Sequence, residues 1–177
     1  MLPEMLIAYV TRSGSTAEVA EALGESLREA GIKADALPMT NVESVPEGKP
    51  VILGAALYVG HFPKEFHQFV AHNRAALTRL HPWVFVMGPT ENEPRHFESA
   101  RQQAEKQLAK YPWLRPIEVR IFGGKFDPRT LTLPFPMSLI MNLPGNPMSK
   151  LPASDIRDWE GIRAWAKSIA DSVKTAA

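Results

Sequence analysis

Short runs of apolar residues alternate along the chain with longer segments in which apolar residues recur every three or four positions. A continuous apolar run is typical of a strand that is buried on both faces of a sheet, and the longer period is typical of a helix with one buried face. The runs that predict strands are 5–10, 32–37, 51–55, 83–87 and 117–122. Strands that alternate with helices in this way predict an α/β fold with a parallel sheet.

Four segments between and after these strands predict helices. Their buried faces are predicted to consist of Val19, Ala20, Leu23, Leu27 and Ala30; of Phe66, Phe69, Val70 and Leu77, in a helix that starts near Pro63; of Phe97, Ala100, Ala104 and Leu108; and of Trp159, Ile162, Ala166, Ile169 and Val173. Gly31 suits the left-handed end of the first helix, and Asp158 suits the N-cap of the last. The elements favour a doubly wound, five-stranded parallel sheet of order 2-1-3-4-5, which binds ligands at the carboxyl ends of its strands.

The chain has 177 residues, a net charge of +1 and no cysteine. This length is typical of one domain over 1–177 with a single core that needs no disulfide. The balanced charge gives no electrostatic footprint for nucleic acid, and the lack of cysteine excludes thiol nucleophiles and cysteine-based metal sites. Because the first residues lack the basic region of a signal peptide, we expect a cytoplasmic location.

A long insert, about 124–157, separates the fifth strand from the last helix. Its central part, 130–149, is apolar and uncharged, and Lys125, Arg129 and Lys150 flank it. Its prolines argue against a membrane-spanning helix. Two interpretations stay open, and they are compatible: extra core packed on the sheet edge, or a lid beside the ligand that contacts a quinone or the inner membrane face.

The first loop carries the clearest candidate chemistry. It follows the first strand, opens the first helix, and consists of Thr11, Arg12, Ser13, Gly14, Ser15 and Thr16. Its hydroxyls, its backbone N–H groups and the positive helix end predict a phosphate site, and Gly14 permits close approach of the backbone. Alternatively, Ser15 and Glu18 form a capping box and the loop only caps the helix. Arg12 is close enough in sequence to offset the charge of Glu18.

Several other chemistries lack their motifs. The chain has neither the glycine-rich loop of ATP-binding proteins nor that of dinucleotide-binding proteins, and no Gly-x-Ser-x-Gly nucleophile elbow. Thr11 and Gly54 stand where a response-regulator receiver needs acidic residues. The five histidines lack the spacing of a metal site, so no metal is expected.

The chain resembles the flavodoxin-like proteins. Ile7, Tyr9, Thr11, Gly14, Thr16, Ala20 and Leu23 have the spacing of the flavodoxin signature. More narrowly, the chain resembles the menaquinone-dependent protoporphyrinogen IX dehydrogenases of that fold. The residues that carry this resemblance are 51–57, Gly60, His61, Phe62, Phe66, Phe69, Val70, the stretch from Phe122 onward and the pattern that starts at Asp158.

This resemblance implies FMN as a non-covalent cofactor. Thr11 to Thr16 would hold the 5′-phosphate, and the loops after the third and fourth strands would enclose the isoalloxazine ring. The residues placed in those loops are Ala56, Leu57, Gly60 and His61, and Gly88, Pro89, Thr90, Glu91 and Asn92. The family tends to have Arg-Tyr before its Gly-His pair, whereas this chain has Tyr58-Val59.

Two side chains in the second loop have open roles. Tyr58 is the best candidate for stacking on the flavin, because its ring is flat and amphipathic, or it is an ordinary exposed loop aromatic. His61 is the one candidate for proton transfer or for a hydrogen bond to flavin or substrate, or it caps the helix that begins near Pro63.

The expected function is an FMN-dependent dehydrogenase that passes electrons from a porphyrinogen to a quinone in haem biosynthesis. One alternative is a flavodoxin-type electron carrier with a protein redox partner, although such carriers are typically strongly acidic. Another is a scaffold that has lost its cofactor, against which the intact first loop argues.

Overall fold

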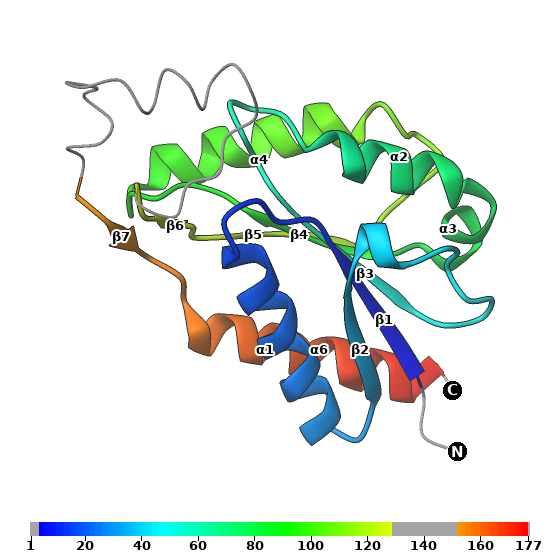
Figure 1. Ribbon diagram of the computed structural model, residues 1–177. Coiled ribbons are helices and arrows are strands. Elements are labelled where there is room, and N and C mark those ends of the chain that lie inside the picture. Colours follow the sequence, from blue (N-terminus) through cyan, green and yellow to red (C-terminus); the bar gives the residue numbers. More distant parts are fainter. Residues whose placement is uncertain (1–3, 129–151, 177) are drawn as a thin grey trace.

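The computed structural model describes residues 4–128 and 152–176 (Figure 1). Its central sheet has five parallel strands in the order β2-β1-β3-β4-β5, which confirms the predicted doubly wound fold. The strands are β1 (Glu4–Tyr9), β2 (Lys33–Pro38), β3 (Val51–Ala56), β4 (Trp83–Met87) and β5 (Glu118–Phe122). The strand order reverses between β1 and β3, so the loops after these two strands meet at one end of the sheet.

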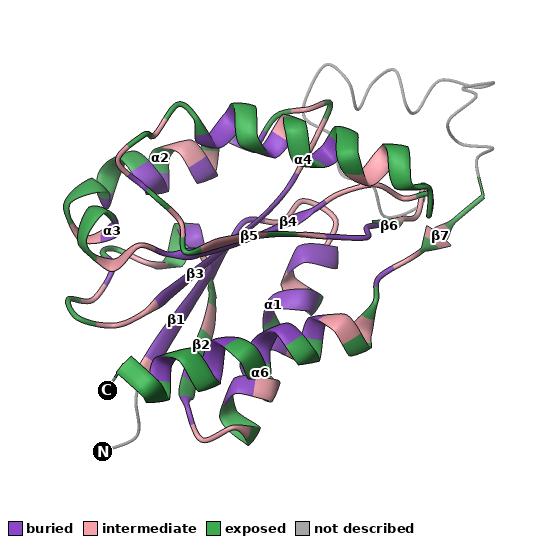
Figure 2. Cartoon of the chain, turned by 180° about the vertical axis from the view of Figure 1, so that it is seen from behind, coloured by how far each residue is buried: buried purple, intermediate pink, exposed green. Residues whose placement is uncertain are grey.

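Strand β3 lies at the centre of the sheet and all of its residues are buried. It pairs with β1 on one side and with β4 on the other, and Figure 2 shows the buried residues concentrated along these strands. Gly54 lies where a side chain would run into the ring of Phe85 on β4. The central strand therefore needs glycine at this position because the phenylalanine fills the space.

Helices cover both faces of the sheet (Figure 1). Helices α1 (Ser15–Glu29) and α6 (Trp159–Ala176) pack on one face, and α2 (Lys64–His72), α3 (Arg74–Leu80) and α4 (Pro94–Leu108) pack on the other. Each face has its own apolar core, in which the predicted helix positions are buried apart from Ala30, Phe97 and Trp159, which are partly buried. A short 3₁₀ helix, Met39–Asn41, follows β2. As predicted, Asp158 caps α6, since its carboxylate accepts the N–H of Gly161 at 3.0 Å.

The helix predicted to start near Pro63 and to extend past Leu77 is in fact two helices, because the chain breaks at Asn73. The Asn73 side chain is buried, and its Oδ1 accepts the N–H of Val45 at 2.8 Å. Its Nδ2 donates to the carbonyl of Phe69 at 3.0 Å. At the break, the Asn73 side chain thus gives a hydrogen-bond partner to the buried N–H of Val45, which lies outside regular secondary structure.

A small antiparallel ribbon, β6 (Lys125–Phe126) with β7 (Ser154–Asp155), follows β5 and precedes α6. Strands this short carry no hydrophobic periodicity, and the sequence does not predict them. The apolar segment 130–149, and with it the membrane or quinone contact predicted there, lies outside the described residues, as do Arg129 and Lys150. Within 4–128 and 152–176, no helix is both long and apolar enough to cross a membrane.

Candidate functional site

The loop between β1 and α1 is built around a glycine in the left-handed conformation. Gly14 has φ of 90° and is the N-cap of α1, and its N–H donates to Thr11 Oγ1 at 2.9 Å. No described side chain caps the helix, and Ser15 is its first residue, so the alternative of a capping box formed by Ser15 and Glu18 is wrong. The first N–H groups of α1 are therefore available to an external acceptor.

Thr16 lies in the first turn of α1 and is fully buried. Among the residues that the structure describes, its Oγ1 has no hydrogen-bond partner. A buried hydroxyl without a partner is costly, so an oxygen-rich ligand at this helix end would satisfy both the hydroxyl and the free N–H groups. The donors present here fit a phosphate.

The loop after β3 forms a tight turn over 58–61. Tyr58 and His61 exchange two backbone hydrogen bonds of 2.9 and 3.0 Å, and the two residues between them, Val59 and Gly60, have φ of 50° and 77°. Gln107 of α4 donates to the Gly60 carbonyl at 3.2 Å. The turn holds the Val59 side chain 86% exposed at its tip, in a conformation that β-branched residues rarely adopt.

Tyr58 contacts the first loop and is not an exposed loop aromatic. The Arg12 guanidinium lies 4.7 Å from the centre of the Tyr58 ring. Burial raises the pKa of the Tyr58 hydroxyl, although hydrogen bonds to the Arg12 backbone and the Ser13 side chain act in the opposite direction. The first and second loops, predicted to share a site, are thus in direct contact.

The loop after β4, residues 88–92, is fixed by the chain that follows β5. Gly88 donates to the Phe122 carbonyl at 2.8 Å, and the Pro89 carbonyl accepts the N–H of Gly124 at 2.7 Å. The Thr90 carbonyl accepts the hydroxyl of Ser154 at 3.0 Å. Beyond it, Glu91 and Asn92 are exposed, and the Glu91 carboxylate lies 3.4 Å from His96 Nδ1.

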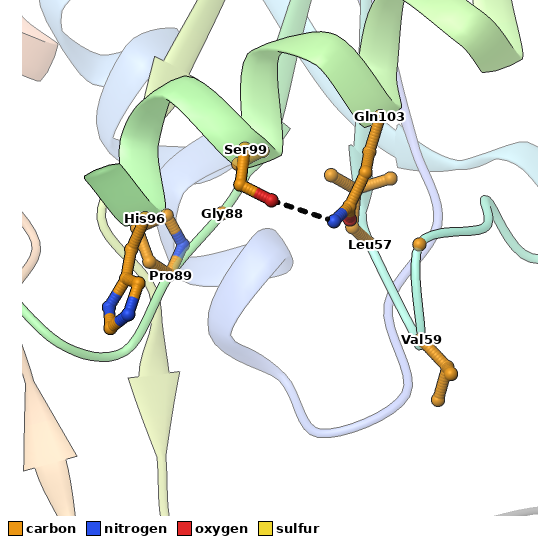
Figure 3. A pocket seen from close by; sticks show the side chains of 9 residues that line it. Leu57, Val59, Gly88, Pro89, His96, Ser99 and Gln103 are labelled. Carbon is orange, nitrogen blue, oxygen red and sulfur yellow. Dashed lines mark hydrogen bonds between the residues drawn. The ribbon is translucent and has the colours of Figure 1, made fainter. Parts of the chain in front are cut away.

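A cavity of about 510 Å³ joins the second and third loops to helix α4 (Figure 3). Its walls combine apolar groups with a few polar side chains, and the lining residues are Leu57, Val59, Gly60, Gly88, Pro89, His96, Ser99, Ala100 and Gln103. Ser99 and Gln103 hydrogen-bond to each other at 3.1 Å along one wall. The sequence predicts Ala100 only as part of the buried face of a helix. It does not predict His96, Ser99 and Gln103 as site residues, because in the sequence they look like the polar face of any amphipathic helix.

A charged cluster lies beside the first turn of α1. The Arg157 side chain is only 3% exposed, and its Nη1 lies 2.7 Å from the Glu18 carboxylate and its Nη2 2.5 Å from Asp155. Lys125 Nζ is 3.3 Å from the same Glu18 carboxylate. Burial raises the pKa of the Glu18 carboxyl, but its bonds to Arg157 and Lys125 outweigh burial and lower that pKa overall. These two cations, and not Arg12 as expected, offset the charge of Glu18.

His61 is exposed, and its Nδ1 lies 2.8 Å from the Val59 carbonyl. The His61 side chain makes no capping hydrogen bond to α2, so the suggestion that His61 caps that helix is wrong. Among the described residues, no cluster of histidine and carboxylate side chains has the arrangement of a metal site.

The comparisons with known proteins agree with this architecture. A family model described as a flavodoxin domain matches residues 6–146. A protoporphyrinogen IX dehydrogenase (quinone) of Escherichia coli (strain K12) is 28% identical to this chain, in an alignment that covers 93% of this chain and 93% of that protein. The similarity thus extends over most of both chains.

Solved structures share the fold at low sequence identity. A short-chain flavodoxin associated with a bacterial microcompartment has a TM-score of 0.53 at 15% identity, with both chains fully covered. Flavodoxin 1 from Bacillus cereus has a TM-score of 0.50 at 16% identity, covering 95% of this chain and 97% of that one. The Flv1 flavodiiron core from Synechocystis has a TM-score of 0.59 at 14% identity, and this chain spans 37% of that longer protein.

Proposed function

Because the chain belongs to the flavodoxin domain family, we propose that it is a flavin-dependent oxidoreductase that binds FMN non-covalently at the carboxyl edge of its sheet. The observation that carries the proposal is the buried Thr16 hydroxyl at the start of α1, where, within residues 4–128 and 152–176, neither this hydroxyl has a partner nor the helix a side-chain cap. The phosphate of FMN would accept hydrogen bonds from the Thr16 hydroxyl and from the free N–H groups at the start of α1.

The 5′-phosphate would be held by residues 11–16. The N–H groups of the first helical turn and the Thr16 hydroxyl would donate to phosphate oxygens, and the positive end of the helix dipole would attract the phosphate charge. Gly14 has open space where a side chain would begin, so the backbone can approach the ligand closely.

The isoalloxazine ring would lie between the second and third loops, next to the cavity lined by Leu57, Gly60 and Gly88. Tyr58 offers it a flat surface, and the backbone of the two glycine-containing loops offers hydrogen-bonding groups at its edge. The flavin supplies the redox chemistry when it is bound, and the protein positions it and excludes water. Under this proposal Ala56 and His61 would border the ring, as would Thr90, Glu91 and Asn92.

We further propose a porphyrinogen as electron donor and a quinone as acceptor, as the name of the Escherichia coli relative implies for that protein. The mixed apolar and polar lining of the cavity supports an organic ring as substrate. The nearly balanced net charge of +1 favours a small-molecule reaction over electrostatic docking on a protein partner. The proposal includes a cytoplasmic location, from which the protein would reach the quinone at the inner membrane face.

An anaerobic spectroscopic experiment tests the proposal. The purified protein is reconstituted with FMN, protoporphyrinogen IX is added, and a menaquinone analogue follows. Bleaching of the flavin absorbance by the porphyrinogen and its return with the quinone is the expected result. Bound FMN that ignores the porphyrinogen but accepts electrons from a flavodoxin reductase identifies an electron carrier instead. Failure to bind FMN after reconstitution contradicts both functions.

A further inference from the structure

Arg157 joins two distant parts of the chain beside the proposed phosphate site. It lies between β7 and α6, and its guanidinium contacts Glu18 of α1 and Asp155, 139 and 2 residues away in sequence. The guanidinium also lies 4.5 Å from the centre of the Trp159 ring. An arginine with a side chain that is 3% exposed is fixed by these contacts and is not a freely moving surface charge.

The Glu18 carboxylate lies in the helical turn where it would repel a bound phosphate, and Arg157 offsets its charge. Glu18 lies in the first turn of α1, the same turn that holds Thr16 and the N–H groups to which we assign the phosphate. Two negative groups within one helical turn repel each other. Arg157 and Lys125 balance the charges of Glu18 and Asp155, so the cluster as a whole is neutral and the positive end of the helix dipole is left for the ligand.

We propose that Arg157 is a positioning residue that sets the affinity for the flavin phosphate by holding and neutralising the Glu18 carboxylate at the start of α1. This inference rests on the proposed function, because it requires FMN as the ligand. Arg157 acts through Glu18 and does not itself touch the cofactor. Lys125 contributes less, because its ion pair with Glu18 is more exposed to water, with the Lys125 side chain 36% exposed.

The test compares FMN with riboflavin, which has the same ring and no phosphate. Arg157→Met removes the charge and keeps a long side chain over Trp159. We expect it to weaken FMN binding about tenfold, as measured by fluorescence titration of the apoprotein, and to leave riboflavin affinity unchanged. Arg157→Lys, which keeps the charge, should recover part of the loss. The double variant Glu18→Gln/Arg157→Met should recover most of it, because the repulsive carboxylate is gone.

The matched control is Arg79→Met, which removes one positive charge from an exposed pair with Glu47 beside the opposite end of the sheet. It should change neither affinity. Equal losses of FMN and riboflavin in Arg157→Met, or no recovery in the double variant, would overturn the inference and leave Arg157 a purely structural residue.

A second variant covers the case in which Arg157→Met fails to fold. If Arg157→Met does not fold, Glu18→Gln alone decides: it should bind FMN as tightly as the wild type or more tightly, and weaker FMN binding would overturn the inference. A wild-type protein that binds neither flavin contradicts the proposed function as well. Failure of the function and failure of the inference therefore give different patterns.

Discussion

At the scale of single residues, the Thr16 hydroxyl is expected to have opposite effects on the stability of the ligand-free protein and on ligand binding. Buried without a partner among the described residues, it is costly in the ligand-free protein, whereas under the proposed function it would donate a charge-assisted hydrogen bond to the phosphate. We expect Thr16→Val to leave the free energy of unfolding of the apoprotein unchanged or to raise it by roughly 1 kcal/mol. The same change should weaken FMN binding about tenfold, which titration of the apoprotein measures.

Thr78→Val is the matched control for this prediction. The exposed Thr78 hydroxyl donates to the Arg74 carbonyl at 2.7 Å on helix α3, away from the three loops of the site. It should leave FMN affinity unchanged. Wild-type FMN affinity in Thr16→Val would show that its hydroxyl does not contact the ligand.

His67 predicts a pH dependence of stability. Its Nδ1 lies 2.6 Å from the Tyr111 hydroxyl, and burial lowers the pKa of its ring, with smaller effects from Lys110 and His61. Between the lowered folded pKa and the ordinary value of about 6.5, the unfolded chain binds more protons than the folded one. The free energy of unfolding should therefore fall as the pH drops below about 6.5. Thermal unfolding of wild type and His67→Gln from pH 8 to pH 5 measures this, and parallel profiles would contradict it.

At the scale of elements, the centre of the sheet tolerates no added side chain at Gly54. We expect Gly54→Ala to lower the free energy of unfolding by about 1–3 kcal/mol, because the new methyl group and the Phe85 ring compete for one space. Urea denaturation measures the change. As a control, Gly24→Ala in α1 would meet the Arg28 guanidinium, which hydrogen-bonds to the Ala34 carbonyl at 2.7 Å but can shift more easily than a buried ring, and should change stability by less than about 1 kcal/mol. Equal effects of the two variants would contradict this account of β3.

The sequence predicts the strands of the main sheet to within one residue, because continuous apolar runs and buried strands coincide. It also places residues 11–16 at the carboxyl edge, where the fold brings them to Tyr58. It does not predict the break at Asn73 or the role of Arg157, because their partners lie 28 and 139 residues away. Contacts of that kind depend on the completed fold and leave no local pattern.

At the scale of the whole molecule, ligand binding should appear as added stability. FMN at one hundred times its dissociation constant stabilises the folded state by about 2.7 kcal/mol. For a chain of this size that corresponds to a rise in Tm of roughly 5–10 °C. Differential scanning calorimetry with increasing FMN measures it, and riboflavin at the same concentration should give a smaller rise. A Tm independent of FMN would contradict binding to the folded state.

The contact between Glu18 and Arg157 also bears on the order in which parts of the chain fold. The βαβ contacts between neighbouring elements are local in sequence, whereas this pair must close a loop of 139 residues. It is therefore expected to form among the last contacts of a refolding chain. Helical structure should return first, and tight flavin binding should return only when the segment that leads into α6 has docked on α1. Recovery of flavin affinity would then mark the completion of folding.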